Sequence, residues 1–242
     1  MPKQLKIFLF VQCLIDSLYP EIGNAVVTLL NTLGIPVIVP PNQTCCGQTA
    51  FNSGYLKEAR KVAKHFIRVF EQADLIVCPS GSCVKMVRVH YPQIFQTDPE
   101  WMDRAKQISS KIFELTEFIV DVMGIHTIES RYQGKVTYHE SCSIGRGLGI
   151  KQQPRELIKN IKNAEFIEMD DSARCCGFGG MFFLKYPEIS TALATEKVAN
   201  IIDTTADTVV SCDIGCLMNI EGLIGQKKYN VKCLHIAQLL II

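Results

Sequence analysis

The sequence predicts an α/β protein of two lobes with a pseudo-twofold relation, each a small parallel sheet with flanking helices and a Cys-Cys-Gly motif. Three observations support this prediction. Short apolar strands alternate with helical segments, the alternation occurs twice, and each copy carries the same series of four cysteines. We expect the first lobe over residues 1–128 and the second over residues 129–242, each long enough to form a domain.

Each copy opens with a strand that leads to a cysteine. Residues 6–10 precede Cys13, and residues 135–139 precede Cys142. Both runs are rich in β-branched and aromatic residues, which is typical of buried strands. We therefore expect each cysteine in the loop beyond the carboxyl end of its strand.

The remaining elements follow in the same order in both copies. We expect helices over 22–33 and 154–161, second strands over 36–39 and 164–168, long helices over 56–72 and 187–202, third strands over 74–77 and 207–210, and closing apolar helices over 115–123 and 234–242. Residues 91–108 are polar and have no counterpart in the second copy, so they form an insertion. In parallel sheets ligands bind beyond the carboxyl ends of the strands, where all the cysteine loops fall.

The cysteine spacing is nearly the same in the two copies. The first cysteine and the adjacent pair are separated by 31 residues in one copy and 32 in the other, and the pair and the last cysteine by 36 and 39. Four thiolates from three loops are typical of a thiophilic metal centre, with an iron–sulfur cluster as the leading candidate. The candidate ligands are Cys13, Cys45, Cys46 and Cys83 for one centre, and Cys142, Cys175, Cys176 and Cys216 for the other.

Other interpretations of the cysteines remain open at this point. A structural zinc site also uses four thiolates, although usually from Cys-x₂₋₄-Cys knuckles. Buried cysteines acting as small hydrophobes and a disulfide within an adjacent pair are further alternatives. Outside the repeat, Cys78 and Cys233 are expected in the core, and Cys212 is a candidate substitute ligand because it lies four residues before Cys216.

Residues beside the cysteines have expected supporting roles. Gly47 and Gly177 are expected to turn the backbone so that both thiolates of a pair face one centre. Backbone amides of residues 177–180 are candidate hydrogen-bond donors to sulfur. His139 is a donor to the centre, an acid–base group facing a substrate, or a buried histidine with satisfied ring nitrogens. The sequence identifies no catalytic residue.

Composition narrows the class of partner. Hydrophobic residues make up 48% of the 242, and 25 basic and 24 acidic side chains give a net charge of +1. Because the charges are interspersed, neither nucleic acid nor an anionic membrane surface is an expected partner. No apolar run approaches a membrane span, and no signal peptide is visible. Eleven cysteines without an export signal favour metal or redox chemistry in the cytoplasm.

Five stretches of the chain resemble a known family. They are CCGQ at 45–48, PSGSC at 79–83, HESC at 139–142, CCGFGG at 175–180 and DIGC at 213–216. They resemble the cysteine-rich, or CCG, domain family of iron–sulfur proteins, which includes the CCG-domain component of heterodisulfide reductase and the iron–sulfur component of glycolate oxidase. The resemblance covers the whole chain and is closest to the lactate utilisation protein A group, whose members are stand-alone pairs of CCG domains.

This resemblance implies cofactors, a function and partners. It implies up to two iron–sulfur clusters of the [4Fe-4S] type and an electron-transfer subunit of an oxidoreductase complex. That complex would oxidise L-lactate, or a related 2-hydroxy acid, to the keto acid, with other iron–sulfur subunits as partners.

The chain departs from the family pattern at two positions. The fuller pattern ends each copy with Cys-x-x-Cys, and here Ser80 and Asp213 stand at the first of those cysteines. Their presence argues against the alternative of a heterodisulfide-reductase-like catalytic subunit, since the extra cysteines accompany disulfide cleavage in that relative. A structural zinc protein is the other alternative.

Overall fold

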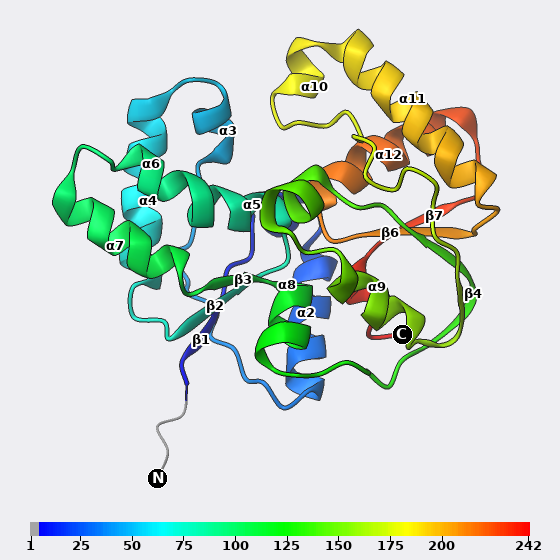
Figure 1. Cartoon of the computed structure of the whole chain (residues 1–242), viewed down its shortest axis with the longest axis horizontal. Coiled ribbons are helices and arrows are strands. Elements are labelled where there is room, and N and C mark those ends of the chain that lie inside the picture. Colours follow the sequence, from blue (N-terminus) through cyan, green and yellow to red (C-terminus); the bar gives the residue numbers. More distant parts are fainter. Residues whose placement is uncertain (1–4) are drawn as a thin grey trace. The chain divides into compact units, whose positions relative to one another are not determined.

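The computed structural model describes residues 5–242, which divide into two compact units between Phe118 and Ile119. Each unit contains one parallel sheet with helices packed against it (Figure 1) and one complete cysteine series. The predicted α/β class with two lobes is confirmed.

The sheet of the first lobe has three parallel strands in the order β1-β2-β3. The strands are β1 (Ile7–Leu9), β2 (Leu75–Cys78) and β3 (Ile112–Glu114). The helices are α1 (Cys13–Leu18), α2 (Pro20–Thr32), α3 (Gln48–Asn52), α4 (Leu56–Phe70), α5 (Gly81–Lys85), the π-helical η1 (Met86–His90), α6 (Tyr91–Ile94), α7 (Pro99–Ser109) and α8 (Leu115–Glu117). Within this lobe, α2 and α8 lie on one side of the strands, and α4, α6 and α7 on the other (Figure 1).

The strand expected over residues 36–39 is reduced to one bridge. Ile38 pairs with Phe8, and its N–H and C=O bond to Ile7 and Leu9 at 2.8 Å each. Pro36 and Pro40 bound this segment, and a proline has no N–H to donate to a strand ladder. Pairing therefore stops after a single residue.

The sheet of the second lobe has four parallel strands in the order β5-β4-β6-β7. The strands are β4 (Arg131–Tyr138), β5 (Lys162–Phe166), β6 (Thr208–Ser211) and β7 (Lys232–His235). The π-helical η2 (Phe118–Val122) spans the boundary between the lobes. The helices of the second lobe are the π-helical η3 (Ser143–Leu148), α9 (Gln152–Lys159), α10 (Phe182–Lys185), α11 (Pro187–Asp203), α12 (Ile214–Lys227) and α13 (Ile236–Leu239). The bridge at Ile38 lies beside β1 as β5 lies beside β4, so the two sheets share one strand order.

The closing segments of both copies differ from the prediction. The helix expected over residues 234–242 starts later, because β7 continues through His235 and pairs there with β6. His235 then caps α13 by accepting the Ala237 N–H at its Nδ1. In the first copy, α8 and η2 occupy the expected helical stretch, but β3, which precedes them, was not predicted.

The two cores differ in composition. Phe10, Phe66, Phe70 and Tyr91 are fully buried in the first lobe and form edge-on and stacked ring contacts. In the second lobe, Cys176 and Cys216 belong to an aliphatic cluster supplied mainly by α11, α12 and β6. The predicted insertion therefore contributes to the core of the first lobe, through Tyr91.

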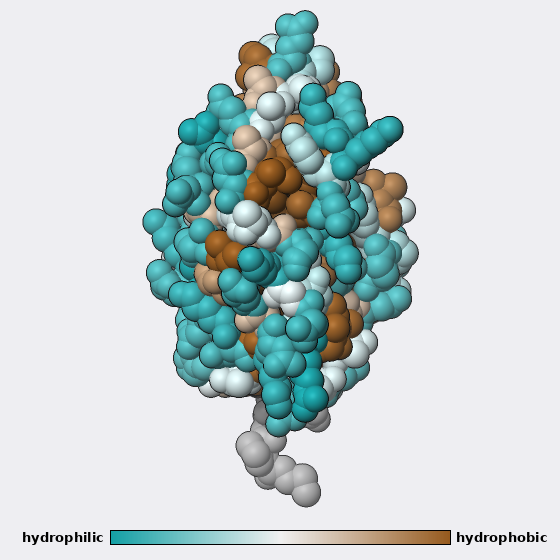
Figure 2. All heavy atoms as spheres, turned by 90° about the vertical axis from the view of Figure 1, so that its right-hand side faces the viewer, coloured by the Kyte–Doolittle hydropathy of each residue, from teal (hydrophilic) through white to brown (hydrophobic). Residues whose placement is uncertain are grey.

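On the face that Figure 2 shows, hydrophilic side chains predominate and hydrophobic ones appear in small separate patches, which is ordinary for a protein surface. Within residues 5–242, no helix combines the length and the apolar character needed to cross a lipid bilayer.

Candidate metal centres

The four cysteines of the first copy come together within the first lobe. Cys13 is the first residue of α1, shortly after β1 ends, and Cys83 lies in α5, just beyond β2. Cys13 Sγ lies 3.7 Å from Cys45 Sγ, and Cys46 Sγ lies 3.4 Å from Cys83 Sγ. Cys46 and Cys83 are buried, whereas Cys13 and Cys45 are partly exposed. One edge of this thiol group therefore faces solvent.

The second lobe brings its cysteines together less completely. The thiol of Cys176 makes hydrogen-bond contacts with those of Cys175 and Cys216. Cys142, just before η3, is exposed, but it lies close enough to Cys216 for the two side chains to interact electrostatically. Three thiols are thus in contact, and Cys142 lies at the exposed margin.

A left-handed glycine follows each cysteine pair, as predicted. Gly47 has φ 85° and Gly177 has φ 83°. Their N–H groups donate to the Sγ of Cys45 and Cys175, at 3.3 and 3.4 Å. Each turn thus directs a backbone amide at sulfur, an interaction that stabilises thiolate and tunes a bound centre.

The second cysteine of each pair is also held through its backbone carbonyl, by two residues that the sequence did not single out. Tyr91, at the start of α6, donates its OH to the Cys46 carbonyl at 2.9 Å. In the second lobe, Asn219 Nδ2 of α12 donates to the Cys176 carbonyl at 2.7 Å. Asn219 lies three residues after Cys216 and therefore near it on the same helix face, so its position beside the centre could have been predicted from the sequence. Tyr91 gave none, because only tertiary packing brings the insertion to this loop.

The thiols have strongly perturbed acidities. Hydrogen bonds from the Cys13 and Cys46 thiols hold the pKa of Cys45 far below its usual range. The pKa of Cys13 is raised, first by its hydrogen bond to Cys45 and then by burial. In the second lobe, contact with Cys176 and burial raise the pKa of Cys175. Because thiols bind metals as thiolates, loading either site must release protons.

A buried ion pair supports the loop that leads to Cys142. Arg155 of α9 donates to Glu140 at 2.8 Å and to Glu168 at 2.7 and 2.9 Å. A Cβ at Gly145 would lie 2.0 Å from Glu140 Oε1, so this glycine makes room for the carboxylate. Burial lowers the pKa of Arg155, but its bonds to Glu168 and Glu140 more than reverse this shift. The sequence did not single out Arg155 as the partner of these two carboxylates.

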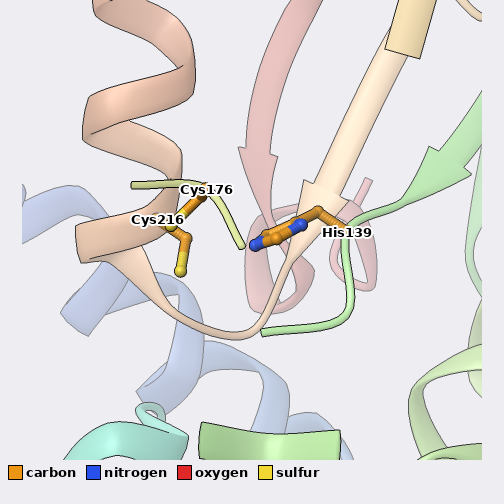
Figure 3. Close-up of side chains that lie close together, drawn as sticks. All are labelled: His139, Cys176 and Cys216. Carbon is orange, nitrogen blue, oxygen red and sulfur yellow. The ribbon is translucent and has the colours of Figure 1, made fainter. Parts of the chain in front are cut away.

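His139 points into the second centre from the end of β4 (Figure 3). Its imidazole is directed toward Cys176 and Cys216, and the ligand atoms of the three residues lie within 4.8 Å of one another. Burial, followed by the nearby Lys197 charge, lowers the pKa of His139 to about 3, so the ring is neutral. Lys197 is itself fully buried and donates to the Asp171 and Ser172 carbonyls at 3.1 Å each.

The structure also places the remaining cysteines and the two positions that depart from the family pattern. Cys78 is buried, and its thiol makes a hydrogen-bond contact with that of Cys83. Cys212 is also buried, and its Sγ lies 3.6 Å from the Tyr138 OH. Cys233 is partly exposed on β7. Ser80 and Asp213 occupy equivalent positions, at the N-caps of α5 and α12.

The donor set suits a thiophilic metal or cluster. Each lobe offers thiol ligands in a largely buried site, with glycine amides directed at sulfur. Soft thiolate donors select zinc, copper(I) and iron–sulfur centres over hard cations. The fold and the thiol clusters thus define a class: a protein of two α/β domains, each with a cluster of cysteines whose chemistry suits a metal centre.

Comparison with known proteins agrees with this class. The model of the cysteine-rich domain family, CCG, matches residues 7–88 and 136–221, more than half of the chain. The fold resembles that of a hypothetical protein from Helicobacter pylori, with a TM-score of 0.68 at 14% identity, over 99% of this chain and 48% of that one. That likeness concerns the fold alone.

Curated relatives match nearly end to end. Lactate utilization protein A of Geobacillus sp. strain WCH70 is 46% identical over 236 residues, covering 98% of this chain and 99% of the relative. The protein of the same name from Bacillus subtilis strain 168 is 44% identical over the same shares. The chain therefore belongs to the lactate utilization protein A family of CCG cysteine-rich domain proteins.

Proposed function

We propose that the chain is an iron–sulfur electron-transfer subunit of a complex that oxidises L-lactate, or a related 2-hydroxy acid, to the keto acid. The observation that supports this most is the gathering of four thiols in the first lobe and three, with Cys142 at the margin, in the second. The substrate follows from relatives named for lactate utilization. On this proposal the partners are further iron–sulfur subunits in the cytoplasm.

The proposed ligands are the two cysteine series. Cys13, Cys45, Cys46 and Cys83 would hold one [4Fe-4S] cluster, and Cys142, Cys175, Cys176 and Cys216 the other. When bound, such a cluster accepts and passes on single electrons. The chain's own residues supply the thiolates, direct the Gly47 and Gly177 amides at sulfur, and exclude water with the buried side chains around Cys46 and Cys176.

A structural zinc protein is the second candidate, favoured by one observation. Thiolates around one tetrahedral zinc ion, each about 2.3 Å from the metal, lie about 3.8 Å from one another. The 3.7 Å and 3.4 Å sulfur separations of the first lobe are close to that value. Metal and sulfide analysis separates the two candidates.

Growth on lactate tests the proposed function. In Bacillus subtilis lacking its own lactate utilization protein A, this chain should restore growth on L-lactate. A variant with both Cys46→Ser and Cys176→Ser should not, because each centre loses a buried ligand. Cys233→Ser is the matched control, since that cysteine lies outside both series, and it should restore growth. Equal growth with the double variant would contradict the proposal.

A further inference from the structure

The two lobes differ in the residue that precedes the first cysteine by three positions. It is Phe10 in the first lobe and His139 in the second. Phe10 is fully buried and packs edge-on against Phe66, with ring centroids 4.9 Å apart. This contact is wholly apolar, so the position in the first lobe that matches His139 offers no ligand atom to a metal.

The helix after the cysteine pair differs at the matching place. Gly47 faces Val62 of α4, and Gly177 faces Leu193 of α11. These contacts align the two helices, and four residues further on Phe66 corresponds to Lys197. The aromatic pair of the first lobe is thus replaced by an imidazole, which lies beside Cys176 and Cys216, and by a buried ammonium, which interacts electrostatically with both.

The imidazole of His139 is buried without a hydrogen-bond partner in residues 5–242. Its exposure is 1%, and neither Nδ1 nor Nε2 makes a hydrogen bond there. A buried polar group without a partner is costly, so such a group calls for an explanation. A neutral imidazole has a ring nitrogen with a free lone pair, and this is the form in which histidine binds metals.

The arrangement shows where that lone pair is directed. The ring points toward Cys176 and Cys216, and the ligand atoms of the three residues lie within 4.8 Å of one another (Figure 3). We infer that His139 supplies a nitrogen ligand to the metal centre of the second lobe, in place of the exposed Cys142 of the proposed ligand set. This centre is therefore a mixed thiolate–imidazole centre, whereas the first is all thiolate. This inference rests on the proposed function only in requiring that the second site holds metal.

The mixed ligand set has an electronic consequence. Imidazole is neutral where thiolate is anionic, and replacing thiolate by histidine raises the potential of an iron–sulfur centre. The buried Lys197 ammonium acts in the same direction. The second centre is thus the one reduced first, at the higher potential.

Pulsed EPR on histidine-labelled protein tests the ligand directly. The full chain is labelled with ¹⁵N-histidine, reconstituted with iron and sulfide without oxygen, and reduced stepwise. The native chain is compared with His139→Phe, which restores the residue of the first lobe, and with His235→Asn. His235 is an equally buried histidine of the same lobe that serves as a helix cap, a role that asparagine fills.

The expected result is a ¹⁵N coupling strong enough for direct coordination, carried by the centre that is reduced first. His235→Asn should keep this coupling and His139→Phe should lose it, with a fall in the potential of that centre. Metal-free His139→Phe should unfold at the same denaturant concentration as the native chain or a higher one, since it loses only an unpartnered ring. This comparison shows that a lost coupling does not reflect a lost fold.

Two results would overturn the inference. One is a native spectrum with both clusters present and no strong ¹⁵N-histidine coupling. The other applies if no iron or sulfide binds, so that the proposed function fails. Cobalt(II) titration of the metal-free proteins then tests whether His139 is a ligand. Binding at the second site at least about tenfold weaker in His139→Phe than in His235→Asn, about 1.4 kcal/mol, supports the ligand. Equal affinities contradict it.

Discussion

Gly177 and Gly47 occupy the same left-handed turn, yet their surroundings differ. A Cβ on Gly177 would lie 2.4 Å from the Ser190 carbonyl oxygen, whereas a Cβ on Gly47 would make only ordinary contacts, at 3.4 Å or more. Gly47→Ala should therefore cost about 1–2 kcal/mol for the left-handed backbone alone. Gly177→Ala should cost clearly more, because the backbone of α11 has to move.

Urea unfolding of the metal-free variants measures this difference. Gly149→Ala is the matched control, because it also has a positive φ and an added Cβ would meet nothing within 4 Å. It should resemble Gly47→Ala. Equal losses for all three variants would show that the clash at Ser190 has no energetic weight.

Glu114 introduces a pH dependence through a single side chain. Burial raises its pKa from 4.5 to about 7, against hydrogen bonds from Thr116 that lower it. Because the folded-state pKa exceeds the unfolded one, the native state binds more protons in this interval. Stability is greatest below the unfolded pKa and falls as pH rises through about 7, by at most about 3 kcal/mol.

Unfolding free energies measured at about pH 5 and about pH 8 check this sign. The native chain should be less stable at the higher pH, and Glu114→Gln should remove most of that difference. A native chain that gained stability over this range, with the variant behaving identically, would assign the titration to other groups.

At the scale of elements, Arg155 ties α9 to the segments that follow β4 and β5. It is nearly buried, as is its partner Glu140, and it also binds Glu168. Arg155→Met should cost about 3–5 kcal/mol, because it leaves the Glu140 carboxylate buried without its partner. Arg174, whose pairs with Asp171 and Glu196 are exposed, is the matched control, and Arg174→Met should cost less than about 1 kcal/mol.

Thermal or urea unfolding of the two arginine variants provides the comparison. Since Glu140 precedes Cys142 by two residues, Arg155→Met should also weaken metal retention in the second lobe. If Arg155→Met unfolded like Arg174→Met, the buried ion pair would have no structural role.

Most elements could be predicted because their signal is local. Residues close together in the sequence are enough to predict an apolar strand followed by a cysteine. The same holds for a helix with a buried stripe, such as α4 or α11. The prediction of a strand at residues 36–39 was wrong because the flanking prolines limit the hydrogen-bond ladder to Ile38. Strand β3 was not predicted because three residues are too few to show a periodic pattern. The prediction that the closing helix begins at residue 234 was wrong because Leu234 and His235 pair with β6 as part of β7.

The candidate centres were predictable in their thiols but not in their supports. The alternation of strands and helices predicts parallel sheets and so places the cysteine loops at one end of each sheet. Tyr91, Arg155 and Lys197 act on residues distant in sequence, so only packing reveals them. The lack of a hydrogen-bond partner for the His139 ring within residues 5–242 likewise depends on the side chains packed around it, so no local sequence pattern predicts it.

For the whole molecule, each lobe contains its own cysteine series. The two centres should therefore load independently. Cys46→Ser and Cys176→Ser should each lose about half of the bound iron, about four atoms if the clusters are of the four-iron type. Iron analysis after reconstitution checks this, and loss of all iron from either variant would show that one centre depends on the other.

The proposed function depends on iron–sulfur clusters in both lobes that carry electrons. Iron and sulfide analysis with EPR, on protein purified and reconstituted without oxygen, tests this most directly. We expect about eight irons and about eight sulfides per chain and a paramagnetic signal on reduction. One or two zinc ions per chain, with no sulfide even after reconstitution, would contradict the proposal and leave a structural zinc protein.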